Sequence, residues 1–228
     1  MGLDMYLYRQ ERIDNYDLKT LLQAKNYYLA IEYEKMHGEI EIKQKSTTER
    51  IQDFVNDWGL NEDELKINTE IIEHLRQYVR FHTTNYGFKY LTLSASDNND
   101  DPEMMYWRKA NAIHNWFVEN VQDGVDDCDC YEVSIDQIYD LMDRCGKILT
   151  TIPKLETILA SEEYDYVFPT KAIKTAEEVL PTLPGFFFGD TDYNYYYFQD
   201  ILDTYNVLKE LIENFDSEKY FYYYHSSW

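Results

Sequence analysis

The sequence predicts an α+β fold, a mainly helical body with a small antiparallel sheet that contains the N- and C-terminal strands. Residues 3–8 alternate apolar and more polar side chains with a period of two, which is typical of a half-buried strand. Residues 220–224 form an aromatic run, and aromatic residues favour strands. Most of the chain between these ends repeats apolar residues every three or four positions, which indicates amphipathic helices.

The N-terminal half is expected to be mainly helical. The predicted helices cover residues 16–37, 48–58 and 61–80. Gly38 and Gly59 would end the first two. Residues 89–94, KYLTLS, predict a third strand, and the polar run 94–103, SASDNNDDPE, predicts a loop. Because no linker rich in Pro, Gly or Ser divides the chain, one domain over residues 1–228 is expected.

The C-terminal half also places apolar residues on helical faces. The predicted helices cover residues 106–122, 134–149, 154–161, 175–180 and 195–215. Two of them begin with the spacing of a capping box, Ser134 with Gln137 and Thr175 with Glu178. Pro181 would end the helix that begins near Thr175.

The charge balance narrows the class of partner. The chain carries 43 acidic and 21 basic side chains, a net charge of −22. A surface this negative repels nucleic acid and anionic lipid, and it attracts basic proteins. The sequence has no apolar run of transmembrane length and no signal-peptide pattern, so a cytoplasmic protein without a membrane partner is expected. Three cysteines without a scaffold spacing predict no disulfide.

Motifs of enzymes and metal sites are missing from the sequence. No phosphate-binding glycine loop, dinucleotide motif, zinc-protease motif or order of a catalytic triad is found. The acidic run from Asp123 to Asp129 suggests a hard cation, but it lacks the spacing of a calcium loop, and a solvated acidic turn is favoured. Cys128 and Cys130 lack the paired spacing of a zinc site. We therefore expect no catalytic residue, no cofactor and no metal.

A candidate ligand pocket surrounds the start of the 106–122 helix. Its predicted residues are Trp107, Arg108, Asn111, His114 and Phe187. Arg108 beside an indole could bind an anion and stack on a ring. The alternative is that Arg108 neutralises nearby carboxylates and that His114 belongs to the core.

The aromatic stretch 185–200, GFFFGDTDYNYYYFQD, has three interpretations: a core element, a binding surface and a catalytic site. We expect residues 185–189 to form a buried strand and turn, and the remainder to begin the last long helix. Tyrosines beside carboxylates are typical of interface hot spots. The predicted partner-binding residues are Asp126, Asp127, Asp190, Asp192, Tyr193, Tyr195, Tyr196 and Asp200.

Four segments together carry a resemblance to a known group of proteins: MGLDMYLY, YWRKANAIHNWFVENVQDGVDDC, LPTLPGFFFGDTDYNYYYFQDI and YHSSW. They resemble a family of small acidic proteins of unknown function encoded by bacteriophages, prophages and other mobile elements. The resemblance covers residues 1–8 and most of 106–228, so residues 9–105 would be a lineage-specific helical insertion. It implies a bacterial host cell and an action on host machinery, and it carries no catalytic residue over.

Two functional hypotheses follow. In the first, the protein is a non-enzymatic inhibitor resembling an anti-CRISPR protein, whose acidic, tyrosine-rich surface mimics nucleic acid and occupies a basic host defence protein. Its net charge matches the phosphates of about 11 duplex base pairs. In the alternative, the protein binds a small molecule and sequesters a nucleotide immune signal. Tyrosine-rich strands at both ends leave a homodimer open.

Overall fold

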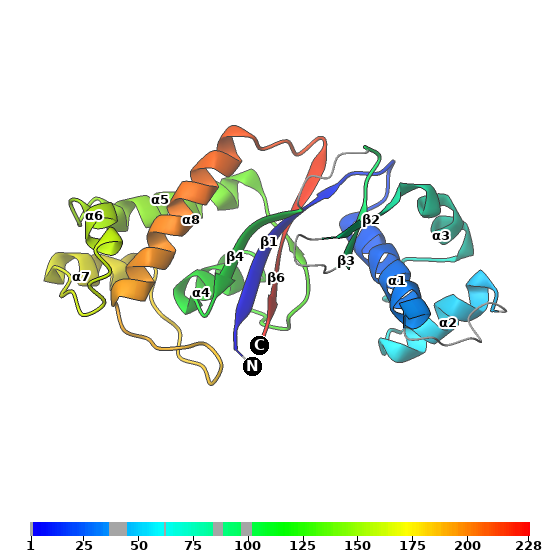
Figure 1. Ribbon diagram of the computed structural model, residues 1–228, viewed down its shortest axis with the longest axis horizontal. Coiled ribbons are helices and arrows are strands. Elements are labelled where there is room, and N and C mark those ends of the chain that lie inside the picture. Colours follow the sequence, from blue (N-terminus) through cyan, green and yellow to red (C-terminus); the bar gives the residue numbers. More distant parts are fainter. Residues whose placement is uncertain (1, 37–44, 62, 84–88, 97–101) are drawn as a thin grey trace. The chain divides into compact units, whose positions relative to one another are not determined.

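The computed structural model describes residues 2–36, 45–61, 63–83, 89–96 and 102–228 (Figure 1). These residues fall into two compact units. Unit 1 comprises Met1–Arg9, Glu103–Ser217 and Tyr222–Trp228, and unit 2 comprises Gln10–Pro102 and Glu218–Phe221. Helices with small antiparallel sheets confirm the predicted α+β class. That the chain is one domain, and that residues 9–105 are an insertion, stay predictions.

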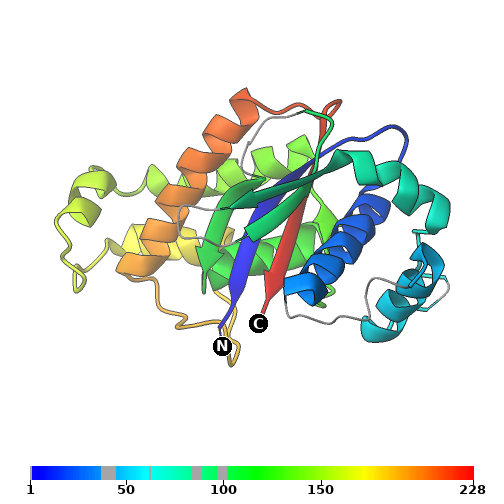
Figure 2. The same ribbon diagram turned by 45° about the vertical axis from the view of Figure 1, so that its right-hand side comes forward.

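The larger sheet contains both terminal strands, as predicted (Figures 1 and 2). Its order is β4-β1-β6-β5, and its strands are Asp4–Glu11 (β1), Glu103–Arg108 (β4), Tyr131–Glu132 (β5) and Tyr220–Ser227 (β6). β1 pairs antiparallel with β4, so that Met5 lies opposite Trp107. Across β1 and β6, the rings of Tyr8 and Tyr223 lie 5.4 Å apart.

The alternation at the start of the chain is confirmed. Leu3, Met5 and Leu7 are fully buried. Tyr6 and Tyr8 alternate with them in β1 and stack on each other with ring centroids 5.3 Å apart. The period of two therefore separates a core face from an aromatic face.

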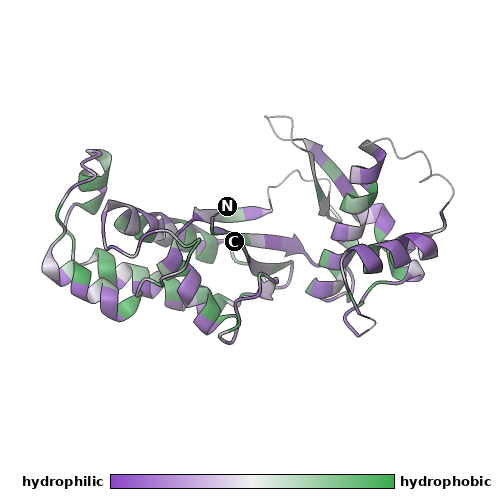
Figure 3. Ribbon diagram, turned by 90° about the horizontal axis from the view of Figure 1, so that it is seen from below, coloured by the Kyte–Doolittle hydropathy of each residue, from purple (hydrophilic) through white to green (hydrophobic). Residues whose placement is uncertain are grey.

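Five helices complete unit 1. They are Asn111–Asn120 (α4), Ile135–Leu149 (α5), Leu155–Ala160 (α6), Thr170–Val179 (α7) and Tyr195–Glu213 (α8). α5 and α8 bury facing apolar side chains that include Leu141, Ile148, Ile201 and Leu208. Figure 3 shows hydrophilic and hydrophobic residues mixed along these helices, as amphipathic helices require.

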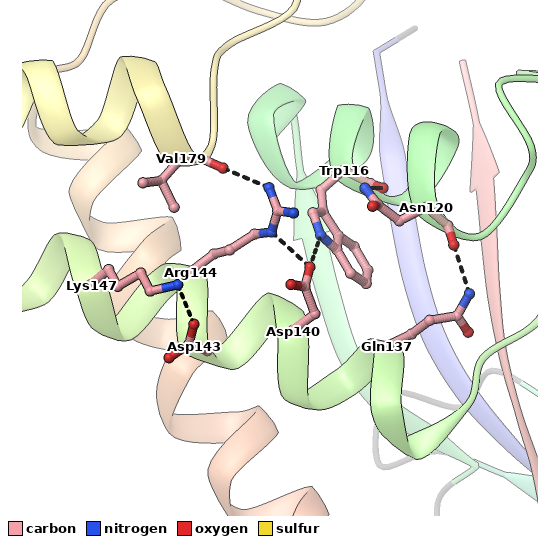
Figure 4. Close-up of polar contacts among 8 residues, drawn as sticks. All are labelled: Trp116, Asn120, Gln137, Asp140, Asp143, Arg144, Lys147 and Val179. Carbon is pink, nitrogen blue, oxygen red and sulfur yellow. Dashed lines mark hydrogen bonds and ion pairs between the residues drawn. The ribbon is translucent and has the colours of Figure 1, made fainter.

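Polar contacts also join α5 to its neighbours (Figure 4). Asp140 accepts hydrogen bonds from Trp116 Nε1 of α4 at 2.9 Å and from Arg144 Nε at 2.7 Å. Arg144 also donates to the backbone oxygen of Val179 in α7, at 3.1 Å. Ser134 caps α5 and completes the predicted capping box with Gln137. Asp140 and Arg144 of α5 therefore tie this helix to α4 and α7.

Unit 2 packs helices on a separate two-stranded sheet. Its helices are Leu18–Met36 (α1), Thr47–Asp57 (α2) and Thr69–Leu75 (α3), followed by the 3-10 turn Arg76–Tyr78 (η2). Val79–Thr83 (β2) pairs antiparallel with Lys89–Leu93 (β3), which confirms the strand predicted near residue 90. Leu21, Phe54, Leu75 and Leu91 belong to its buried core.

Several element boundaries differ from the prediction. Of the helix expected over 61–80, the structure contains only α3 and the turn η2, because Asn68 caps α3 and β2 begins at Val79. The helix expected to begin near Thr175 begins at Thr170. The glycine expected to end the first helix, Gly38, lies outside the described residues.

The helix expected over 106–122 is wrong at its start. Residues 103–108 form β4 and pair with β1, and the helix begins only at Asn111. Trp107 fits the apolar spacing of a helix as well as that of a strand, and pairing with a neighbouring strand decides between the two. Residues 185–189 form a turn instead of a strand, in which Phe186 is 95% exposed and Phe188 is buried.

Candidate functional site

A cavity of about 330 Å³ lies in unit 1 at the start of α4. The loop between α7 and α8 and the first turns of α8 form its other walls. Its charged lining residues are Arg108, Lys109, Asp190, Asp192 and Asp200. The cavity therefore holds two basic and three acidic side chains in a protein that is otherwise strongly negative.

The basic side chains come from the junction of β4 and α4. Arg108 is the last residue of β4, and Lys109 adopts a positive φ of 60° that turns the chain out of the sheet. Ala110 then precedes α4 without a side-chain cap. The first N–H groups of a helix carry partial positive charge, so the α4 start adds to the field of Arg108 and Lys109.

Asn111 holds in place the cavity wall formed by the loop between α7 and α8. Its side chain is 4% exposed, and its Nδ2 donates to the backbone oxygens of Phe188 at 3.1 Å and Asp190 at 2.8 Å. Its Oδ1 accepts from the backbone N–H of Leu183 at 3.1 Å. Since the amide is occupied by these bonds, Asn111 positions the loop rather than offering a free group to a ligand.

The loop is shaped by Gly189 and Asp190. Gly189 has a φ of +87°, and a Cβ there would lie 3.1 Å from Lys109 Cβ, so a side chain is disfavoured twice. The Asp190 carboxylate accepts from the backbone N–H of Asp192 at 2.6 Å and from Asn194 Nδ2 at 2.9 Å. Asn194 in turn caps α8 by accepting from the N–H groups of Tyr196 and Tyr197.

Two charged residues of the cavity have distinctive surroundings. The Arg108 side chain is 60% exposed, and its Nη1 lies 3.6 Å from Asp4 Oδ1. Burial, and secondarily the nearby Asp203, raise the pKa of Asp200 to about 7. Arg108 is therefore accessible, while Asp200 can change protonation near neutral pH.

The structure brings together residues from both predicted sets. Arg108 and Asn111 of the predicted pocket line the same cavity as Asp190, Asp192, Tyr196 and Asp200 of the predicted partner surface. Tyr196 is 62% exposed.

Other predicted residues lie elsewhere in unit 1. Trp107 is buried and donates from Nε1 to Thr204 Oγ1 at 2.8 Å. The backbone oxygen of Phe187 accepts from Leu3, and Phe187 does not line the cavity. Tyr195 is buried, with its hydroxyl donating to the backbone oxygen of Leu159 at 2.7 Å, so its expected role as an exposed anchor is wrong.

The partly buried Tyr193 packs against Tyr197 with ring centroids 4.8 Å apart. Its hydroxyl accepts from the backbone N–H of Thr182 at 3.3 Å. Tyr193 therefore belongs to the loop before α8 without lining the cavity. Of the three predicted tyrosines, only Tyr196 presents a largely exposed ring.

His114 belongs to a buried network. Its Nδ1 lies 2.7 Å from the Tyr224 hydroxyl oxygen, and its Nε2 lies 3.1 Å from Asp126 Oδ2. Burial lowers the pKa of His114, while Asp126 acts in the opposite direction. Asp126 also accepts from Trp228 Nε1. His114 therefore follows the core alternative rather than the pocket prediction.

Asp127 lies on the exposed acidic loop near β5. It accepts from Tyr131 Oη at 2.9 Å and from the backbone N–H of Asp129 at 3.0 Å. Burial and the carboxylates of Asp127, Asp129 and Asp123 raise the pKa of Tyr131 to about 12. A concentrated negative field therefore surrounds this tyrosine.

Sequence reasoning missed Asn194 and Thr182 as parts of the cavity wall. An asparagine directly before a helical pattern is an N-cap signal and could have located the start of α8. In the described part of the chain, no group of three or more His, Cys, Asp or Glu side chains is placed to hold a metal ion. None of the described helices is both long and apolar enough to cross a membrane.

Comparisons of the chain with protein-family models, with curated proteins and with solved structures returned no match. The functional argument therefore rests on the geometry and chemistry of the cavity.

Proposed function

We propose that the protein is a non-enzymatic binder of a mononucleotide, held in the cavity of unit 1. The observation that carries this proposal is the placement of Arg108 and Lys109 at the start of α4 in a cavity of about 330 Å³. Ligand cavities span roughly 300–1,000 Å³, so this one suits a small ligand at the lower end of that range. A mononucleotide fits this size better than a dinucleotide.

The cavity offers chemical groups suited to the phosphate, the base and the ribose of a nucleotide. Guanidinium, ammonium and helical N–H groups are the usual partners of phosphate, and Arg108, Lys109 and the α4 start supply them. The exposed ring of Tyr196 offers a stacking surface for a base. Asp190, Asp192 and Asp200 supply acceptors for ribose hydroxyls or base amino groups.

The biological setting of this proposal comes from the resemblance to phage and prophage proteins. Two of the segments that carry the resemblance contribute lining residues of the cavity: all of Arg108–Ile113 from one segment, and several residues between Gly189 and Ile201 from the other. Sequestration of a nucleotide immune signal in the bacterial cytoplasm would use such a site without any reaction.

Thermal unfolding with a panel of mononucleotides tests the proposal. At a ligand concentration 100 times the dissociation constant, binding stabilises the folded state by about 2.7 kcal/mol and raises the melting temperature. The Arg108→Gln variant should lose this shift. The matched control is Lys209→Gln, an exposed basic residue of α8 that does not line the cavity. An equal shift in wild type and Arg108→Gln would remove Arg108 from the proposal.

A second candidate function is the inhibition of a basic, nucleic-acid-binding host defence protein. The observation that favours it is the charge of unit 1, which carries 24 acidic and nine basic side chains. The exposed Asp123, Asp127 and Asp129 gather around Tyr131, where carboxylates could stand in for phosphates.

Salt dependence and competition test this second candidate. Host proteins captured by the wild type should be released by DNA or RNA and by rising salt. The Asp127→Asn, Asp129→Asn double variant should capture less of them. Asp143→Asn is the control, because Asp143 is already paired with Lys147. Capture that ignores ionic strength and nucleic acid would contradict the inhibitor hypothesis.

A further inference from the structure

A second cavity, of about 520 Å³, lies in unit 2. Helices α1 and α2, the α3–η2 segment and strand β2 contribute its walls. Four basic residues line it, namely Lys35, Lys45, Arg50 and Arg76. Glu73 is its one acidic lining residue among those described, and Glu73 Oε1 accepts from Thr47 Oγ1 at 2.6 Å.

This concentration of positive charge is unusual for the chain. Unit 2 carries 19 acidic and 12 basic side chains, so an average patch of its surface is negative. Lys35 belongs to α1, Arg50 to α2 and Arg76 to η2, and Lys45 precedes α2. The fold therefore gathers basic residues from separate elements around one cavity. Like charges repel at short range, so such a cluster is most stable with an anion among its members.

Two lysines of the cluster form ion pairs with carboxylates that lie outside the cavity lining. Lys35 pairs with Glu32 at 3.3 Å, and Lys45 pairs with Asp53 at 2.8 Å. Neither carboxylate lines the cavity. Within the described parts of the chain, Arg76 forms no ion pair with a carboxylate.

Arg50 and Arg76 line the cavity together with Tyr27. Burial raises the pKa of the Tyr27 hydroxyl, the charges of Arg50 and Arg76 lower it, and Glu73 and Glu34 add to the rise. Arg50 belongs to α2, Arg76 to η2 and Tyr27 to α1, so three elements bring these side chains to one cavity. Two guanidinium groups in one cavity suit a phosphate, which accepts several hydrogen bonds at once.

We propose that the cavity of unit 2 binds the phosphate group of a small organic phosphomonoester. Arg50 and Arg76 hold the phosphate, and Lys35 and Lys45 add to the positive field at the cavity wall. The organic part contacts the aromatic lining residues Tyr28 and Phe81. Phe81 is 53% exposed, and the Tyr28 hydroxyl is already bonded to the backbone oxygen of Ile72.

The site is independent of the cavity in unit 1, because the two share no residue. The Arg108→Gln protein is therefore the parent for the test, so that an anion bound in unit 1 does not obscure the signal. Isothermal titration calorimetry uses three probes: phenyl phosphate, inorganic phosphate and benzyl alcohol. We expect phenyl phosphate to bind this parent with one site, more tightly than inorganic phosphate, and benzyl alcohol to give no measurable binding.

Variants locate that binding. Arg50→Gln and Arg76→Gln, each added to the parent, should raise the dissociation constant of phenyl phosphate about ten-fold or more. Lys66→Gln is the matched control, because Lys66 is an exposed basic residue of unit 2 outside the cavity, and it should leave the constant unchanged. Circular dichroism confirms that each variant is folded, and Arg76→Lys, which keeps the charge, should retain part of the affinity.

Three results would overturn the proposal: no phenyl phosphate binding to the folded parent, unchanged affinity in both arginine variants, or equal binding of benzyl alcohol. Inorganic phosphate that binds as tightly as phenyl phosphate would overturn the assignment of an organic ligand.

Discussion

Asn111 Nδ2 donates a hydrogen bond to the backbone oxygen of Asp190 at 2.8 Å. The bond joins the first residue of α4 to the loop that precedes α8. Together with the bonds to Phe188 and Leu183, it makes one buried amide responsible for the position of the cavity wall.

Replacing this amide should destabilise unit 1. Asn111→Ala leaves buried backbone groups of the loop without partners, and we expect the free energy of unfolding to fall by on the order of 3 kcal/mol. Asn115→Ala, on the same helix, should change it by less than about 0.5 kcal/mol. Urea denaturation of both variants gives the comparison, and equal stabilities would contradict the role of Asn111.

The loop also depends on Gly189. Gly189→Ala meets an unfavourable φ of +87° and a contact of 3.1 Å with Lys109 Cβ. Gly124 has a φ of +79° but open space around it, so Gly124→Ala isolates the backbone cost, about 1 kcal/mol. Thermal unfolding should show the larger loss for Gly189→Ala. If the two losses are the same, Lys109 does not pack against the loop.

Asp200 makes stability depend on pH in one direction. Its pKa is about 7 in the folded protein against an ordinary value of 3.8, so the folded state holds its proton more tightly. The ionised carboxylate therefore lowers the free energy of unfolding as pH rises from about 4 to about 7. Asp200→Asn should stabilise the protein at pH 8 by on the order of 2 kcal/mol and have little effect at pH 4. Denaturation at both pH values checks this, and a variant that is less stable at pH 8 would argue against a buried charge.

His114 acts in the opposite direction. Burial lowers its pKa below 6.5, so the unfolded state takes up the proton first. The contribution of neutral His114 to the free energy of unfolding is complete above pH 6.5, and it is lost as the pH falls below that value. Between pH 7.5 and pH 5, wild type should lose more stability than His114→Gln, which does not titrate. His225, whose pKa burial also lowers, is present in both proteins and cancels in the comparison. Equal losses would show that His114 is accessible to protons.

The sequence predicted those parts of the fold whose signals are local. The capping box of Ser134 and the alternation of Leu3, Met5 and Leu7 each involve neighbours in the chain, and both are confirmed. Trp107 was assigned to a helix because its apolar spacing fits one, yet Met5 across the sheet makes it part of a strand. A pairing partner 102 positions away leaves no local signal.

The candidate site was predictable only in parts. Arg108 and Asn111 stood out as polar residues within an apolar pattern, and Asp190 stood out as a carboxylate among aromatic residues. That these residues line one cavity depends on the bonds between Asn111 and the loop, which lie more than 70 residues apart in sequence. The burial of Tyr195 was missed, because it depends on a contact with the carbonyl of Leu159 in α6.

The central proposal is that the cavity of unit 1 holds a mononucleotide, and isothermal titration calorimetry tests it most directly. The measurement titrates adenosine, guanosine, cytidine and uridine 5′-monophosphates into wild type, Arg108→Gln and the control Lys209→Gln. We predict that at least one of them binds wild type and Lys209→Gln with the same affinity, and that Arg108→Gln binds it about ten-fold more weakly or worse. No binding of any of the four, or equal binding in wild type and Arg108→Gln, would contradict it.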